Sequence, residues 1–247
     1  FTDQILDCTE LAAVEEALPD DVLYKPPSEI YEKVVCSRCE KSLLEMDLAS
    51  HMNAHSSEVI AGFLFLGSMQ SAHNKKELTV RTGITDIMNL AEEVDNVFEL
   101  CFEGCECEGG GHDCNGRSEG SAGQRRRLFT YHTTKIKDRE NEDIFPLFEA
   151  SYHTLEAVRE AGGRVLVHCV QGISRSSSVV IAYLMRSREW SLKKAYEHCR
   201  AARSIAKPIA WFLLELIRYE ETLVSRMALE GYAGAPSLAI DDVYPAG

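Results

Sequence analysis

The stretch RVLVHCVQGISRS, residues 164–176, decides the fold of this 247-residue chain. Its apolar run, residues 165–167, follows a Gly-Gly pair and precedes a glycine-containing loop, which is typical of a strand buried on both faces of a parallel sheet. The next residues, SSVVIAYLM (177–185), are apolar nearly all round and predict a helix within the core. The sequence therefore predicts a strand, a tight loop and the start of a buried helix, in that order.

The loop between this strand and helix has the composition of an anion site. A helix N-terminus offers unpaired backbone N–H groups and the positive end of the helix dipole. Cys169 opens the loop, where such a field favours a thiolate, and Arg175 closes it with a guanidinium that can bind two phosphoryl oxygens. The pattern predicts a phosphate-transfer site; the alternative is a small buried cysteine before an ordinary helix cap. The predicted phosphate-binding residues are Val170, Gln171, Gly172, Ile173, Ser174 and Arg175.

The run HCVQGISRSSSVVIAYLM (168–185) contains His-Cys-x5-Arg-Ser, the signature of cysteine-dependent protein phosphatases, and resembles their dual-specificity branch, especially domains similar to MAP-kinase phosphatases. Residues 59–68, a predicted bent strand pair, and residues 84–90, a predicted buried strand, are similar to segments of that family. Asn89 matches a family position near the loop or caps a strand end. The resemblance covers about residues 58–224. It implies an α/β protein-tyrosine-phosphatase-like fold, a mostly parallel central sheet flanked by helices, which the alternation of strands and helices also indicates.

The resemblance also implies a mechanism that needs no cofactor for catalysis. Phosphotyrosine and phosphoserine or phosphothreonine would be hydrolysed through a phospho-cysteine on Cys169, with Asp138 as general acid. Glu140 and Asp143 are the neighbouring alternatives to that acid, in solvent-facing or capping roles. A catalytically weak adaptor that only binds phosphate is the competing function, although the complete catalytic set argues against it. In that set, Arg175 binds the phosphoryl oxygens, Ser176 hydrogen-bonds the departing thiolate, and His168 orients the loop and supports the thiolate.

A second motif lies upstream, where CSRC (36–39) and HMNAH (51–55) have the spacing of a C2H2 zinc finger. Cys36, Cys39, His51 and His55 are the predicted ligands of a structural zinc ion; two histidines that share a helix by chance are the alternative. The pattern resembles the ubiquitin-binding fingers of translesion polymerases. Those fingers have Asp where Asn53 stands here, so packing against the phosphatase or binding another protein competes with ubiquitin as the role of the finger.

Residues 92–127 interrupt the phosphatase pattern with a segment rich in glycine and charge, which predicts a surface insertion without regular structure. Five of its side chains could instead hold a second zinc ion, although their spacing fits no standard finger. These are Cys101, Cys105, Cys107, His112 and Cys114.

Several further elements follow from hydrophobic periodicity. Residues 128–136 predict a strand, and a helix with an apolar face from Ile144 to Val158 should follow, with Asp143 as its N-cap. Helices are also expected at 191–203 and 209–223. The predicted domains are an acidic tail (1–29), the finger (30–57), the phosphatase domain (58–225, with its insertion at 92–127) and a second tail (226–247).

The composition indicates which classes of partner and which cellular compartment to expect. The net charge of −13 argues against nucleic acid, and the longest apolar runs are too short to cross a membrane. The nine cysteines lie mostly in metal-type spacings, which favours the reducing cytoplasm or nucleus. The expected partners are phosphorylated protein substrates, MAP kinases among them, and ubiquitin or another protein for the finger.

Overall fold

The computed structural model describes residues 33–35, 42–44, 51–105, 126–229 and 243. The chain divides into two compact units, residues 1–48 and 49–247. In the first unit, strands β1 (Lys33–Val35) and β2 (Ser42–Leu44) pair antiparallel. The predicted zinc ligands Cys36 and Cys39 follow β1 in sequence but lie outside the described residues.

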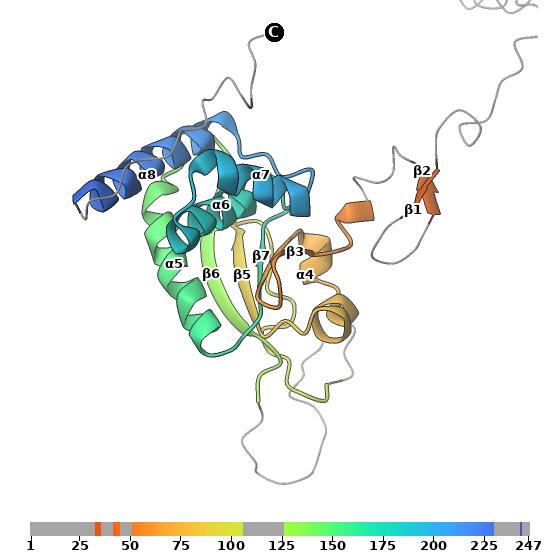
Figure 1. Cartoon of the computed structure of the whole chain (residues 1–247). Helices are drawn as coiled ribbons and strands as arrows, with labels where there is room; N and C mark the ends of the chain where they lie inside the picture. The colour runs from red at the N-terminus through yellow and green to blue at the C-terminus, as the bar shows by residue number, and fades with distance from the viewer. Residues whose placement is uncertain (1–32, 36–41, 45–50, 106–125, 230–242, 244–247) are drawn as a thin grey trace, which may run out of the picture. The chain divides into compact units, whose positions relative to one another are not determined.

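The second unit is built on a five-stranded sheet with the order β3-β4-β7-β5-β6 (Figure 1). The first two strands form an antiparallel hairpin, whereas β4, β7, β5 and β6 run parallel. The predicted α/β fold with a mostly parallel sheet is confirmed. The strands are β3 (Ser57–Ile60), β4 (Leu64–Gly67), β5 (Asp86–Ala91), β6 (Thr130–Ile136) and β7 (Val165–His168).

Strand β7 lies in the middle of the sheet, and all four of its residues are buried. Because side chains alternate along a strand, Val165 and Val167 face one layer of helices while Leu166 faces the other side. The apolar run therefore supplies core to both faces, as its composition predicts. Helices α5, α6, α7 and α8 contribute to the larger core (Figure 1). The helices are α4 (Met69–Ala72), the π-helix η2 (Glu77–Arg81), α5 (Phe145–Glu160), α6 (Arg175–Arg188), α7 (Leu192–Ala202) and α8 (Ala210–Leu229).

Two helix ends differ from the sequence-based expectation. Asp143 is exposed and is not the N-cap of α5; Ile144 takes that position without a side-chain cap bond. Burial of the Ile144 side chain, which is 0% exposed, outweighs the contribution of about 1 kcal/mol that a cap would make. Helix α8 continues to Leu229, beyond the predicted end at 223, because residues 225–229 contain neither glycine nor proline.

The first part of the predicted insertion belongs to the folded domain. Residues 92–105 cover the face of the sheet opposite α5, and Phe98 and Cys101 are buried there against Ile87 and Leu166. Residues 92–105 contain no helix or strand, as expected for an irregular insertion. The expectation of a surface position is wrong for Phe98 and Cys101, whose side chains belong to this second apolar core. Cys107, His112 and Cys114 lie outside the described residues.

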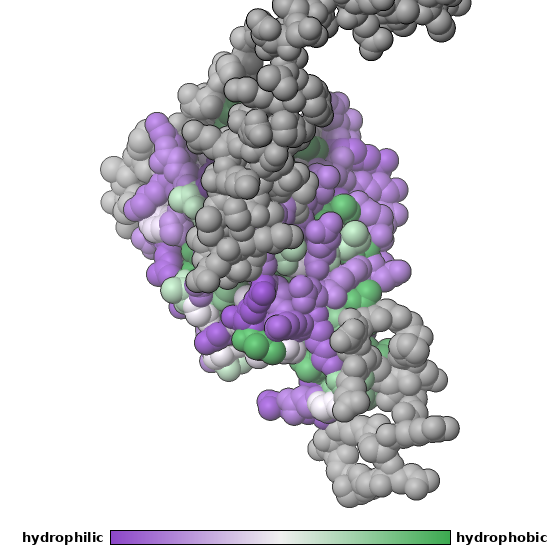
Figure 2. Space-filling view, turned by 90° about the vertical axis from the view of Figure 1, so that its right-hand side faces the viewer, coloured by the Kyte–Doolittle hydropathy of each residue, from purple (hydrophilic) through white to green (hydrophobic). Residues whose placement is uncertain are grey.

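The described surface is predominantly polar. No helix in the described ranges is both long and apolar enough to span a bilayer. On the coloured part of the face shown in Figure 2, hydrophilic residues predominate and hydrophobic ones form small, separate groups.

Phe98 provides a test of whether residues 92–105 are integral to the fold. Phe98→Ala should lower the free energy of unfolding by about 3–5 kcal/mol, because it leaves a cavity in the second core. Leu100→Ala is the matched control, since Leu100 is 58% exposed and its loss should cost little. Urea denaturation measures both variants; similar small losses would show that the segment is dispensable.

Candidate active site

The candidate site lies where three parallel strands end. The carboxyl ends of β5, β7 and β6 share one edge of the sheet, which is where open α/β sheets bind ligands. Glu93 follows β5, Asp138 follows β6 and Cys169 follows β7. Cys169 is 1% exposed and begins the phosphate loop, residues 169–174, after which α6 starts at Arg175.

Four successive carbonyl groups of the phosphate loop accept hydrogen bonds from outside the loop. The pairs are Met69 N to Val170 O (2.9 Å), Arg203 Nη2 to Gln171 O (2.8 Å), Arg203 Nε to Gly172 O (2.9 Å) and Lys207 N to Ile173 O (2.8 Å). In a planar trans peptide, the N–H of the next residue points away from the carbonyl. The N–H groups of residues 171–174 therefore face the inside of the loop, where an anion would sit.

The sulfur of Cys169 accepts two hydrogen bonds. Gly172 N donates to Sγ over 3.3 Å, and Ser176 Oγ donates over 3.2 Å. The thiol also packs against Ala91 and Val94. This arrangement stabilises negative charge on the sulfur while apolar neighbours shield it from solvent.

Gly172 is required by the shape of the loop. Its φ of +68° lies in the left-handed region, and a Cβ added there would come within 2.4 Å of Gly67 O. The end of β4 thus approaches the loop too closely for any side chain.

Arg175 is 3% exposed and is held from one side. Nη1 and Nη2 donate to the two carboxylate oxygens of Glu93 over 2.8 and 2.7 Å, and Nη1 also donates to Ile136 O over 3.1 Å. Nε lies 3.8 Å from Asp138 Oδ2 and has no hydrogen-bond partner among the described residues. Burial opposes the charge of the guanidinium, but Glu93 and the other negative groups nearby raise the pKa of Arg175. A charged donor is therefore available for a ligand.

Glu93 was not singled out by the sequence, although its position after a strand neighbouring β7 is a usable signal. Asn89 shapes the turn that carries it: Asn89 Nδ2 donates to Val94 O (2.8 Å), and Asn89 Oδ1 accepts from Ala91 N (3.0 Å). This confirms the strand-capping role considered for Asn89. The hydrogen bond from Arg175 lowers the pKa of Glu93, which keeps the ion pair intact.

Asp138 is the candidate acid that contacts the phosphate loop. Its Oδ1 accepts a hydrogen bond from Ser174 Oγ over 2.7 Å, and its side chain is 34% exposed. A hollow of about 350 Å³ lies beside it, lined by Glu92, Glu93, Lys137 and Asp138. Glu140 and Asp143 are exposed, and neither forms a hydrogen bond with the described phosphate loop.

His168 is buried at the end of β7, with Nδ1 3.3 Å from Cys169 O. Burial lowers the pKa of His168 to about 4, and the charges of His73 and Arg175 act in the same direction. The ring is therefore neutral near pH 7. It can support the loop through a hydrogen bond to Cys169 O, but it supplies no positive charge to the thiolate.

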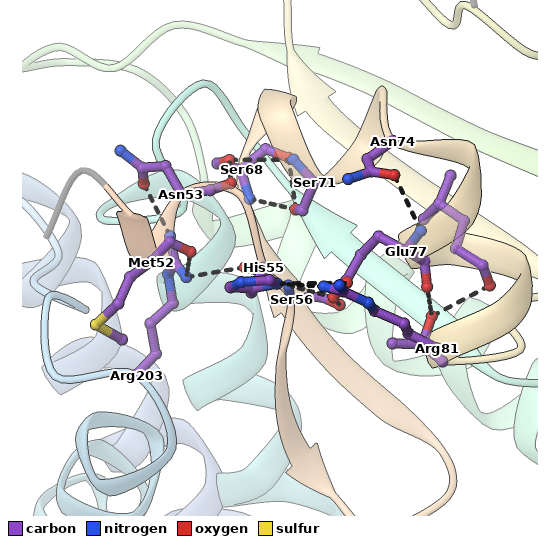
Figure 3. Close-up of polar contacts among 12 residues, drawn as sticks. Met52, Asn53, His55, Ser56, Ser68, Ser71, Asn74, Glu77, Arg81 and Arg203 are labelled. Carbon is purple, nitrogen blue, oxygen red and sulfur yellow. Dashed lines mark hydrogen bonds and ion pairs between the residues drawn. The ribbon is translucent and has the colours of Figure 1, made fainter. Parts of the chain in front are cut away.

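The histidine segment, residues 51–56, packs on this same unit (Figure 3). The rings of His51 and His55 are 4.9 Å apart between centroids, and His55 Nδ1 lies 3.4 Å from Glu77 Oε2. His55 Nε2 is buried without a hydrogen-bond partner in the described part of the chain. Burial would raise the pKa of Glu77, but hydrogen bonds from Ser56 N, Ser56 Oγ and His55 lower it overall.

The structure brings the predicted catalytic residues together but not the full set of predicted zinc ligands. No group of three His, Cys, Asp or Glu side chains suited to a metal occurs within the described ranges. Cys36 and Cys39 are outside those ranges, whereas His51 and His55 are within them.

The family follows from a direct match. The family model "Dual specificity phosphatase, catalytic domain" matches residues 64–222, which is more than half of the chain. The chain belongs to the dual specificity phosphatase family. The match includes the phosphate loop and Asp138. It is the same family that the signature resembles.

Curated relatives agree with this assignment. Protein phosphatase Slingshot homolog of Xenopus laevis is 32% identical over 177 residues, 72% of this chain and 22% of the relative. Dual specificity protein phosphatase 1 of Mus musculus is 31% identical over 184 residues, 74% of this chain and 42% of the relative. The first three Slingshot relatives are matched over only 13 to 29% of their own length.

Solved structures support the fold. Human DUSP28 is 29% identical with a TM-score of 0.53, covering 68% of this chain and 94% of that chain. Human tyrosine phosphatase-like serine/threonine/tyrosine-interacting protein is 28% identical with a TM-score of 0.53, covering 69% and 98%. Both similarities therefore extend over nearly the whole of the compared structures.

The buried state of His168 makes stability depend on pH. In the unfolded chain the ring binds a proton below about pH 6.5, whereas in the folded protein it does so only below about pH 4. Stability should therefore fall as the pH drops from 6.5 towards 4, by on the order of 3 kcal/mol from this group. Comparison with His168→Asn isolates this contribution.

Urea denaturation at pH 7, 5.5 and 4 measures the difference in unfolding free energy between wild type and His168→Asn. That difference should become smaller, or change sign, as the pH falls. His153→Asn is the control, because His153 is exposed. A difference that stays constant from pH 7 to pH 4 would contradict a buried neutral imidazole.

Proposed function

We propose that this chain is a protein phosphatase that hydrolyses phosphotyrosine and phosphoserine or phosphothreonine through a phospho-cysteine. One observation carries the proposal: the loop carbonyls are bonded from outside, Gly172 N donates to Cys169 Sγ, and Arg175 Nε has no hydrogen-bond partner among the described residues. Such a cradle fits the equatorial oxygens of a transferring phosphoryl group. Membership of the dual specificity phosphatase family gives independent support.

In the first step of this proposal, Cys169 Sγ attacks phosphorus. The S–P bond forms while the P–O bond to the substrate side chain breaks, and Asp138 gives its proton to the departing oxygen. The loop N–H groups and Arg175 stabilise the negative oxygens. The hydrogen bond of Asp138 to Ser174 supports this role, because it holds the carboxyl group at the rim of the loop.

In the second step, water attacks the phosphorus of the phospho-cysteine and Asp138 accepts a proton from that water. The S–P bond breaks, inorganic phosphate leaves and the electron pair returns to sulfur. Ser176 Oγ, 3.2 Å from Sγ, donates to the departing thiolate. Side chains and backbone of this chain supply every group in these steps, so the proposal assigns no cofactor to catalysis.

The proposed substrates are phosphorylated proteins, MAP kinases among them. The carboxylates of Glu93 and Asp138 are both partly exposed beside the hollow, which supports access for phosphorylated side chains on a protein surface. The non-catalytic adaptor is not favoured, because the candidate nucleophile, acid and arginine are all present at one loop. A location in the cytoplasm or nucleus stays a prediction from cysteine usage.

We further propose that Cys36, Cys39, His51 and His55 bind a structural zinc ion. The Cys-x2-Cys and His-x3-His spacing supports this, and β1 and β2 pair on either side of the Cys36–Cys39 motif in sequence. His55 Nε2 is buried and has no hydrogen-bond partner among the described residues, while Arg81 Nη1 and Glu77 Oε2 lie 3.2 and 3.4 Å from Nδ1. Zinc would hold this small finger together, and ubiquitin or another protein is its proposed partner.

The covalent mechanism predicts a specific behaviour of Cys169→Ser. Hydrolysis of p-nitrophenyl phosphate should fall by more than about 1,000-fold because the nucleophile is lost. Tungstate binding, measured by calorimetry, should persist because the loop N–H groups remain. Cys105→Ser is the control and should retain activity. A Cys169→Ser variant with substantial turnover would rule out the phospho-cysteine.

The acid role predicts a dependence on the leaving group. Asp138→Asn should slow hydrolysis of a phosphothreonine peptide by about 100-fold or more, because a basic alkoxide needs a proton. A difluorinated aryl phosphate, whose leaving group is weakly basic, should be affected by less than about tenfold. Steady-state kinetics with both substrates provides the comparison.

Glu140→Gln and Asp143→Asn are the controls for Asp138 and should change neither rate. A uniform loss across leaving groups would instead indicate that Asp138 only shapes the loop. A selective loss in either control would move the acid to that residue.

Elemental analysis tests the zinc proposal. The purified chain should contain about one zinc ion, or two if the 92–127 segment binds another. His51→Ala should lose the first. Protein that was never exposed to a chelator and holds no metal would exclude the finger.

A further inference from the structure

Arg203 is a buried arginine that contacts both the phosphate loop and the histidine segment. Its side chain is 0% exposed, and on the loop side it donates from Nη2 to Gln171 O (2.8 Å) and from Nε to Gly172 O (2.9 Å). On the other side it donates to three oxygens of the histidine segment (Figure 3). These are Met52 O (3.2 Å, from Nη1), His55 O (3.5 Å, from Nη1) and Asn53 Oδ1 (3.1 Å, from Nη2).

The five oxygens match the hydrogen-bonding capacity of the Arg203 side chain. A guanidinium has five N–H donors in a rigid planar fork, and burying it is unfavourable when those donors lack acceptors. The loop carbonyls provide two of the five acceptors, and the histidine segment provides the other three. The buried position of Arg203 beside the loop therefore depends on the histidine segment.

One peptide unit connects Arg203 to the candidate nucleophile. The carbonyl of Gln171 accepts from Arg203 Nη2, and the N–H of the same peptide, on Gly172, donates to Cys169 Sγ over 3.3 Å. In a planar trans peptide these two groups point in opposite directions. The direction in which Arg203 holds the carbonyl thus sets the direction of an N–H group that contacts the sulfur.

A second connection runs through the start of α4. Ser68 Oγ donates to Asn53 O over 2.6 Å, and the next residue, Met69, donates from its backbone N–H to Val170 O over 2.9 Å. Three of the four outward loop carbonyls are therefore bonded either by Arg203, which contacts the histidine segment, or by the residue that follows Ser68, which contacts it too.

Glu77 holds the other end of the histidine segment. Its Oε1 accepts from Ser56 N and Ser56 Oγ over 3.0 and 2.8 Å, while its Oε2 lies 3.4 Å from His55 Nδ1 and from Arg81 Nη1. These contacts do not involve Arg203. The segment is therefore fixed to the phosphatase unit by a separate group, and its oxygens are available to the guanidinium.

We propose that residues 52–55 are part of the phosphate site, and that Arg203 is the positioning residue through which they act. The family match begins at residue 64, so this support comes from a part of the chain outside it. The three acceptors fix the orientation of the guanidinium, which then holds the carbonyls of Gln171 and Gly172 outward. The proposal deepens the phosphatase function proposed above, rests on it, and requires no metal.

Arg203→Lys tests the positioning role. Lysine keeps the charge but has three N–H donors on one atom, so it cannot bond five surrounding oxygens at once. We expect tungstate affinity, measured by calorimetry well below the thermal midpoint, to fall by about tenfold, and kcat/KM for an aryl phosphate by a similar factor. Arg200→Lys is the matched control and should equal wild type, since Arg200 is exposed and bonds Ser204 O. An Arg203→Lys protein that equals wild type in both measurements would overturn the proposal.

Asn53 gives a test that leaves Arg203 and the loop unchanged, and that holds if Arg203→Lys does not fold. Asn53→Ala removes an acceptor of Arg203, and tungstate affinity should fall by about threefold or more. Asn53→Asp keeps an oxygen acceptor and should retain most of the affinity. Asn53 is partly exposed, so both variants should fold. Wild-type affinity in Asn53→Ala, or equally weak binding in both variants, would contradict the role of the segment.

A double-mutant cycle distinguishes action through Arg203 from an independent effect. Asn53→Ala should weaken tungstate binding much less in the Arg203→Lys background than in wild type, because the bond it removes is already lost. In the Arg200→Lys background it should have its full effect. Additive losses in the Arg203→Lys cycle would overturn the coupling. A merely structural role would lower the thermal midpoint without changing the tungstate affinity of the folded protein.

Tungstate binding does not require turnover, so the outcomes separate this proposal from the activity on which it rests. Unchanged tungstate affinity in Arg203→Lys and Asn53→Ala, with Cys169-dependent hydrolysis intact, overturns the proposal and leaves the phosphatase function standing. Hydrolysis that survives in Cys169→Ser contradicts the phospho-cysteine, whereas the tungstate comparisons still decide the role of Arg203.

Discussion

The outward direction of four loop carbonyls is the constraint on which the site depends. A loop can turn its N–H groups towards an anion only if its carbonyls find donors on the other side, since unpaired buried carbonyls are costly. Met69 at the start of α4, Arg203 at the end of α7 and Lys207 before α8 supply those donors. Elements from three parts of the chain are thus needed to shape six residues.

Local donors also explain how a chain with a net charge of −13 can present an anion site. The loop N–H groups and Arg175 act at hydrogen-bond distance, where they outweigh distant charges that solvent screens. Glu93 has two opposing effects. Its bidentate bond fixes the Arg175 guanidinium, yet its carboxylate neutralises part of the positive charge; Nε has no hydrogen-bond partner among the described residues.

The histidine segment lies on the other side of a domain boundary from the one that the sequence predicts. Sequence spacing assigns residues 51–55 to a separate finger, but the segment belongs to the compact unit that contains the phosphatase sheet. Glu77, Ser68 and Arg203 hold it there through buried hydrogen bonds. The family match begins only at residue 64. The histidine segment therefore lies outside the part of the chain that the family model covers.

The sequence by itself determined the local features of the protein. The apolar run before Cys169 and the apolar helix after Arg175 predicted the strand–loop–helix unit correctly. Hydrophobic periodicity and turn-forming residues are local properties, so a short stretch of sequence is enough to read them. The family resemblance indicated Asp138, which follows a strand, and Asp138 is the candidate acid that contacts the loop.

Only the tertiary structure decided which distant groups complete the site. Arg203 carries no local pattern that separates it from ordinary surface charges, and Glu93 is marked only by its position after a strand. Each acquires its role when the sheet order and the path of α7 bring it to the loop. The packing of residues 92–105 and the N-cap of α5 were likewise decided by burial of Phe98 and Ile144. Long-range packing outweighs local composition there, because burying one large apolar side chain contributes more than a cap or a loop propensity.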